Sequence, residues 1–146
     1  MLSAVFDSTI LVSAFLTPRG LTDQLLTLAR RGAFDLYLSD EIIDETQTVL
    51  LERERIRQRY VYTDEQAIRF CRSLRPSFHL VKDPPVVSGV VRDPNDDMVI
   101  ACALAASAPY LVTRDPDLLT LKTYQGVQMI SPEEFIHLVR KHTPQP

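Results

Sequence analysis

The sequence predicts an α/β fold in which a central parallel sheet is covered by helices. Short apolar runs alternate with amphipathic segments along the chain, and this alternation is typical of strands joined by crossover helices. The 146 residues suit one domain, expected over 1–146, and a hydrophobic content of 45% is enough for one core. We therefore expect a single α/β domain.

The N-terminal elements follow from apolar runs and the residues that end them. Residues 2–6 predict a buried strand, and residues 9–15 predict a short helix that ends before Pro18. Residues 21–31 are amphipathic, with leucines on one stripe, and Gly32 follows as a C-terminal cap. This part of the chain predicts a strand followed by two helices.

The middle of the chain contains two helix starts. After a second strand over residues 34–38, Ser39 is a suitable N-cap for a long helix that becomes highly charged after Glu52. Thr63 begins a capping box for a further helix that runs through Leu74. We expect these two helices to follow the second strand.

The last part of the chain alternates between strands and helices. Residues 78–91 are rich in strand formers but interrupted by prolines, and residues 98–106 predict a helix of small residues. Strands are expected over 110–113 and 127–130, and Ser131 is the N-cap of a final helix. The pattern extends the parallel sheet to the C-terminal region.

The net charge of −3 makes a dedicated nucleic-acid-binding domain less favoured, because such domains are usually basic. It does not exclude an enzyme with many acids in one site, since bound divalent ions reverse the local charge. The apolar N-terminus lacks a basic region and is interrupted by Asp7, so it does not predict a secretion signal. No run of about 18 apolar residues predicts a membrane span. We expect a cytoplasmic protein.

Four acidic residues stand out as candidate catalytic groups. Asp7 and Asp115 each directly follow an apolar strand, and sites in open α/β sheets form beyond the carboxyl ends of strands. Glu45 borders the buried stripe of its helix, and Asp97 lies near a helix start. Taken alone, Glu45 could face solvent, and Asp97 could be no more than a first-turn acid favoured by the helix dipole. Together they predict an acidic site.

Carboxylates are the ligands that Mg²⁺ or Mn²⁺ prefers, and the absence of a histidine cluster disfavours zinc. Several carboxylates in one pocket would otherwise have to take up protons, because two charges about 4 Å apart repel by roughly 4 kcal/mol at an effective dielectric near 20. Five further residues flank the four acids and are supporting candidates: Ser8, Asp93, Asp96, Thr113 and Asp117. Of these, Asp93 could do no more than start a turn, and Asp96 could be a solvated acid in the first helical turn.

Two arginines are candidates for phosphate contact. Arg92 and Arg114 each adjoin a candidate acid, so either could bind an RNA phosphate. Each could equally be an ion-pair partner that positions its neighbour. The sequence leaves both interpretations open.

Four segments together resemble the PIN-domain ribonucleases, in particular the VapC-type toxins of bacterial toxin–antitoxin systems. Each segment alone is weakly specific, but the four follow one another in the expected order over nearly the whole chain. They are AVFDSTILVSAFL, LSDEIIDETQTVL, RDPNDDMVIACALAASAPYLVTRDPDLL and VQMISPEEFIHLV.

The resemblance implies a three-layer α/β/α PIN-like fold and an RNA-cleaving site that depends on Mg²⁺ or Mn²⁺. By position it makes Asp7, Glu45, Asp97 and Asp115 catalytic, with all but Glu45 binding the metal. Ser8 or Thr113 would orient the attacking water, and Asp93 and Asp117 would be supporting carboxylates of the site. It leaves open which of Asp93, Asp96 and Asp97 faces the metal. It also implies a homodimer and a cognate antitoxin partner.

Three alternatives compete with this hypothesis. A haloacid-dehalogenase-type phosphotransferase needs a second acid two residues after Asp7, where Thr9 stands. A receiver domain needs paired acids at the first strand and a late strand-end lysine, yet Phe6 precedes Asp7 and only Lys122 lies near a late strand end. A non-catalytic PIN-fold module that binds RNA or protein is the remaining alternative, although the four acids favour catalysis.

Overall fold

The computed structural model describes residues 2–142. Its centre is a six-stranded sheet in the order β3-β2-β1-β4-β6-β5. All neighbouring strands are parallel except β5 and β6, which are antiparallel. The strands are β1 Ser3–Phe6, β2 Asp35–Ser39, β3 His79–Val81, β4 Tyr110–Val112, β5 Thr123–Tyr124 and β6 Val127–Ile130.

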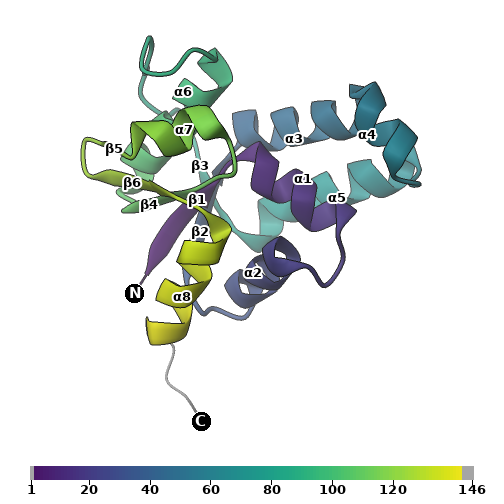
Figure 1. Cartoon of the computed structure of the whole chain (residues 1–146), viewed down its shortest axis with the longest axis horizontal. Coiled ribbons are helices and arrows are strands. Elements are labelled where there is room, and N and C mark those ends of the chain that lie inside the picture. Colours follow the sequence, from purple (N-terminus) through teal and green to yellow (C-terminus); the bar gives the residue numbers. More distant parts are fainter. Residues whose placement is uncertain (1, 143–146) are drawn as a thin grey trace.

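Eight helices are described, and they flank this sheet (Figure 1). The predicted α/β architecture with a central, mostly parallel sheet is therefore confirmed. The helices are α1 Ser8–Leu16, α2 Leu21–Arg30, α3 Asp40–Glu52, α4 Glu54–Arg59, α5 Asp64–Ser77, α6 Pro94–Ala106, α7 Pro116–Leu121 and α8 Pro132–His142. Among the described residues, every helix is too short or too polar to cross a lipid bilayer.

Local sequence accounts for most helix starts. The Ser39 hydroxyl accepts the backbone N–H of Ile42, as expected for an N-cap, and Thr63 forms a capping box with Gln66. The expected long helix after Ser39 is divided, because Arg53 has an extended backbone between α3 and α4. These caps fix where α3 and α5 begin.

The core lies between the sheet and its helices. Phe6 of β1 and Phe34 both contact Phe135 of α8 edge-on, with ring centroids 6.1 Å and 4.9 Å apart. All three rings are almost completely buried. Each buried phenylalanine stabilises the fold by about 1.5–3 kcal/mol relative to an exposed one, so this cluster anchors α8 to the sheet.

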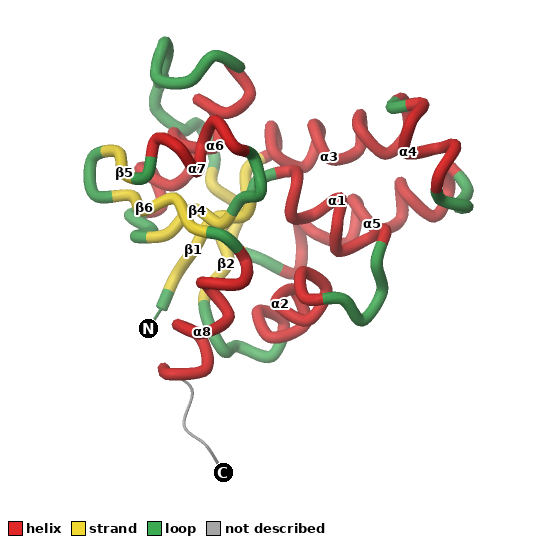
Figure 2. The backbone as a smooth tube through the Cα atoms, viewed as in Figure 1, coloured by secondary structure: helices red, strands yellow, loops and turns green. Residues whose placement is uncertain are grey.

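Two expectations were wrong in detail. The stretch 78–91 contains only the short strand β3, because Pro84 and Pro85 have no N–H for a sheet ladder and a loop follows them. Figure 2 shows this loop leading into α6. The helix expected over 98–106 begins four residues earlier, at Pro94, because Asp93 caps it. This earlier start changes which acids face the site.

The strand order places a switch point between β1 and β4. From β1 the chain continues through β2 and β3 on one side, whereas β4 and β6 lie on the other. In open α/β sheets, ligands bind beyond the carboxyl ends of the strands at such a point. Asp7 follows β1 and Thr113 follows β4, so both lie at this position.

Candidate acidic active site

Asp7 lies under the site and is held by several hydrogen bonds. It caps α1, and its Oδ1 accepts the Thr9 hydroxyl at 2.5 Å and the Ile10 N–H at 3.2 Å. The Thr113 hydroxyl donates a short hydrogen bond to the other oxygen. Burial raises the pKa of Asp7 to about 6, although these hydrogen bonds favour the charged form, and the nearby Asp115 adds to the rise.

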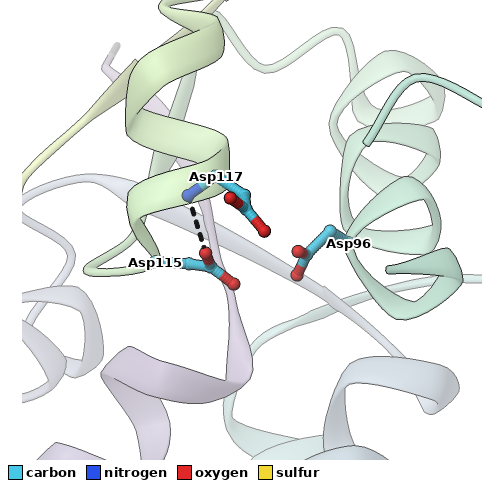
Figure 3. Close-up of side chains that lie close together, drawn as sticks. All are labelled: Asp96, Asp115 and Asp117. Atoms are coloured by element: carbon cyan, nitrogen blue, oxygen red, sulfur yellow. Dashed lines mark hydrogen bonds between the residues drawn. The ribbon is translucent and has the colours of Figure 1, made fainter. Parts of the chain in front are cut away.

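Three aspartates converge above Asp7. One carboxylate oxygen from each of Asp96, Asp115 and Asp117 lies within 4.8 Å of the others. Asp96 projects from α6, and the other two come from the start of α7 (Figure 3). Asp115 caps α7 by accepting the N–H of Asp117 at 2.9 Å. The structure thus gathers the N-cap acid and a first-turn acid of α7 with one acid of α6 at the switch point.

Asp96 is the least satisfied member of this cluster. Its side chain is buried, with 8% of the residue exposed, and its Oδ2 has no hydrogen-bond partner among the described residues. Burial, followed by the negative charges of Asp115, Asp93 and Asp7, raises the pKa of Asp96 to about 7. A buried oxygen without a partner carries a free-energy cost that a bound cation would remove.

Asp97 is not part of this cluster. Both of its oxygens accept backbone N–H groups, from Gly89 at 3.0 Å and from Val91 at 2.9 Å. Neighbouring helical residues point about 100° apart, so Asp96 and Asp97 face different surroundings. The structure brings Asp96, and not the sequence candidate Asp97, toward Asp115.

A groove of about 280 Å³ opens over the cluster, lined by Asp96, Asp115 and Glu45 among others. Glu45 is half-buried, and its Oε2 accepts the side-chain amide of Asn95 at 3.3 Å. The structure therefore places Glu45 in the same groove as the aspartates. Sequence reasoning missed Asn95, although its place in the first turn of a capped helix between acids could have drawn attention to it.

The supporting candidates have distinct positions. Ser8 and Asp93 line the groove, and Asp93 caps α6 by accepting the N–H of Asn95. Thr113 is fully buried and links two acids, since its hydroxyl donates to Asp7 and its oxygen accepts the N–H of Asp115 at 2.9 Å.

Thr9 was also missed, because a threonine in a helix beside Ser8 has no distinctive sequence pattern. Its hydroxyl donates to Asp7 and its oxygen accepts the N–H of Arg114 at 3.1 Å. Thr9 therefore ties the first turn of α1 to the segment after β4.

Both arginine candidates form ion pairs within the chain. Arg92 lies 3.0 Å from the Asp117 carboxylate, and Arg114 lies 3.0 Å from Glu133. The Arg92 side chain is 86% exposed, so its pair with Asp117 is a surface contact at the edge of the cluster. The geometry favours the ion-pair interpretation over phosphate contact for both residues.

The donor set fits a hard divalent cation. The cluster offers carboxylate oxygens only, one of them buried without a partner, and these are the ligands of Mg²⁺ and Mn²⁺. At the same time, the negative charges raise the free energy of the ionised, metal-free cluster. The arrangement can hold a cation beside a groove that opens to solvent.

Comparison with known proteins identifies the family. The PIN-domain family model matches residues 3–117, which is most of the chain. Among curated proteins, none matches the chain significantly.

Two solved structures share the fold. VapBC2 from Rickettsia felis, crystallised with a DNA fragment from its promoter, matches with a TM-score of 0.58 and 12% identity, over 89% of this chain and 98% of that one. PAE2754 from Pyrobaculum aerophilum matches with a TM-score of 0.59 and 16% identity, over 96% of each chain. At these identities the likeness shows a common fold.

Proposed function

The chain belongs to the PIN-domain family of nucleases, and from this premise we propose that it is a metal-dependent endoribonuclease. The observation that supports this most is the Asp96 carboxylate, which is buried, has an oxygen without a partner and faces Asp115 and Asp117. A cation bound to this carboxylate would offset the free-energy cost of its buried oxygen without a partner. A structural acid would instead be satisfied by protein donors, as Asp97 is.

In this proposal Asp96, Asp115 and Asp117 hold Mg²⁺ or Mn²⁺, and Asp96 takes the place that the sequence suggested for Asp97. Asp7 lies below them, adds negative charge and fixes the start of α1 beside the site. When bound, the ion neutralises phosphoryl oxygens and makes water more acidic.

The reaction is hydrolysis of an RNA phosphodiester. The water oxygen bonds to phosphorus, the bond from phosphorus to the leaving sugar oxygen breaks, and that oxygen takes a proton from solvent. Glu45, held by Asn95 in the groove, accepts the proton that the water loses. Ser8 lines the same groove and orients the water with its hydroxyl.

Two partners belong to the proposal. One fold neighbour is a VapBC pair, and on that likeness we extend the proposal to a toxin that forms a homodimer and is restrained by a cognate antitoxin. The chain would act as one cytoplasmic domain over 1–146. The alternative function is a PIN-fold module that binds RNA or protein without cleaving it.

The test is cleavage of a panel of RNAs with Mg²⁺, with Mn²⁺ and with chelator. We expect cleavage with either ion, none with chelator, and none for Asp96→Asn with either ion. The matched control is Asp83→Asn, which changes an exposed loop aspartate that does not line the groove and should retain full activity. If the protein binds Mn²⁺ but cleaves no RNA, this result would contradict the proposed enzymatic function. If it does not bind Mn²⁺, the result would favour the non-catalytic module.

A further inference from the structure

The groove above the acids has a second end with different chemistry. Its acidic end is formed by the aspartates and Glu45, and its other end lies where α3 passes into α4. At this aliphatic end Val49 of α3 and Ile56 of α4 flank Arg53 in the chain, and Val12 of α1 lines the same groove. The proposed hydrolysis uses none of them.

The two ends are joined along α3 and its C-cap residue, Arg53. Glu41, Glu45, Val49 and Arg53 follow one another at intervals of four and all line the groove, so they form a single stripe. At a rise of about 1.5 Å per residue, Arg53 lies roughly 12 Å along the helix axis from Glu45. A nucleic-acid strand whose cleaved phosphate lies at the acids can reach Arg53 with a neighbouring phosphate.

Arg53 has an unusual position in this groove. Among the described residues that line the groove, Arg53 is the one basic residue, and five are acidic. Its side chain is exposed and has no ion-pair or hydrogen-bond partner in residues 2–142. Arg53 stands between α3 and α4, but its side chain makes no capping hydrogen bond. By contrast, Arg57 of the following helix α4 pairs with Asp64. A phosphate group entering this acidic groove has one fixed positive charge to bind.

The aliphatic end suits a nucleobase. The groove as a whole, acidic end included, has a volume of about 280 Å³, several times the roughly 30 Å³ share of one water molecule, so it has room for a flat organic group beside the acids. The aliphatic side chains offer no hydrogen-bonding groups for the edges of a base, and Arg53 is the one charged group at this end. Such a surface accepts any base by contact with its face and selects little between them.

We propose that the aliphatic end of the groove binds one unpaired base next to the cleaved phosphate, while Arg53 binds an adjoining phosphate. This inference rests on the proposed ribonuclease function and adds a base subsite and a phosphate-binding residue to it. A base in a duplex is stacked and paired, so it must leave the helix before it can enter. The enzyme therefore prefers unpaired RNA and tolerates many sequences.

The first test uses the wild-type protein and a single-stranded RNA whose cleavage position has been mapped with Mn²⁺. Abasic nucleotides are placed one at a time along this strand. We expect an abasic nucleotide at one position beside the cleaved bond to raise KM on the order of tenfold, as expected for loss of one base contact. Abasic nucleotides farther away, and a strand with all its bases, should behave alike.

The second test compares Arg53→Gln with Arg55→Gln. Arg55 is exposed on α4, has no partner among residues 2–142 and does not line the groove, which makes it a matched control. We expect Arg53→Gln to raise KM and to lower the slope of log KM against log salt by about 0.7, as for one lost single-strand phosphate contact. Arg55→Gln should change neither.

Three outcomes would overturn the inference. If no abasic position changes KM and the two arginine variants behave alike, RNA does not use the aliphatic end, and a segment of a protein partner would be its better occupant. Equal cleavage of the strand alone and in a duplex would refute the need for an unpaired base. If no RNA is cleaved with Mn²⁺, the proposed function fails, and the subsite fails with it.

Discussion

Asp96 and Asp97 are neighbours in α6, yet their carboxylates have opposite environments. Asp97 accepts N–H groups from Gly89 and Val91, whereas Asp96 has a buried oxygen without a partner and faces Asp115. One residue therefore holds a loop in place, and the next is available to a cation. Several expected outcomes depend on this division of roles.

Asp97→Asn should destabilise the protein through the loop after β3. An asparagine keeps one acceptor oxygen but turns an NH₂ group toward a backbone N–H, so a buried donor loses its partner. We expect unfolding by urea to show a loss of about 1–3 kcal/mol. Faster proteolysis between β3 and α6 should accompany it. A variant as stable as Asp83→Asn would show that Asp97 does not hold this loop.

Metal-free protein should lose stability as the pH rises. Asp96 has a pKa of about 7 in the folded protein against an ordinary value of 3.8, and Asp7 has a pKa of about 6 against the same value. The unfolded chain therefore releases these protons at a lower pH than the folded protein does. The stability that is present below pH 3.8 is lost as the pH rises through about 7. Urea unfolding in chelator at several pH values measures this trend.

The Asp96→Asn variant serves as the comparison for this pH dependence, because it removes the group with the more strongly raised pKa. Its stability should vary less with pH than that of the wild type. If the wild type in chelator became more stable between about pH 4 and 7, and the variant did the same, the acids would not be crowded in the folded protein.

Thr113→Val should weaken both the fold and the site. The change keeps the shape of the side chain but removes the hydroxyl that donates to Asp7 and accepts from Asp115 N–H. We expect a loss of about 1–3 kcal/mol in unfolding free energy and a lower kcat, because buried groups lose their partners. Thr120→Val, at an exposed position of α7, is the control. Equal stability of the two variants would remove Thr113 from the framework of the site.

Arg114→Gln should have a small effect. Arg114 pairs with Glu133 at the surface, where both side chains are about half exposed, and such pairs contribute up to about 1 kcal/mol. We expect the KM for RNA to stay unchanged, and Glu133→Gln to match Arg114→Gln in stability. A tenfold higher KM for Arg114→Gln alone would restore the phosphate-contact role that the sequence left open.

Most of the sheet could be predicted because its strands are short apolar runs bounded by caps. Ser39, Thr63 and Ser131 marked helix starts correctly, since capping is a local property of the chain. The short helix α7 and strand β5 were not predicted. They contain only six and two residues, and the pairing of β5 with β6 depends on contacts across the sheet.

The acidic character of the site could also be predicted, because Asp7 directly follows β1 and Asp115 comes two residues after Thr113, which follows the end of β4. The choice among the acids of α6 could not, since it depends on the helix start. Once Asp93 caps α6 and Pro94 becomes its first residue, Asp96 turns toward α7 and Asp97 toward the loop. The roles of Thr9 and Asn95 depend on hydrogen bonds with distant residues, which no local pattern reveals.

The most direct measurement of the metal site is calorimetric titration of the protein with Mn²⁺ near neutral pH. Wild-type protein should bind the ion and release protons as it does so, because Asp96 is partly protonated beforehand. Asp96→Asn should lose this binding, and folded Asp97→Asn should retain it. Unchanged Mn²⁺ binding by Asp96→Asn, or loss of binding in folded Asp97→Asn alone, would contradict the assignment of Asp96 as the α6 ligand.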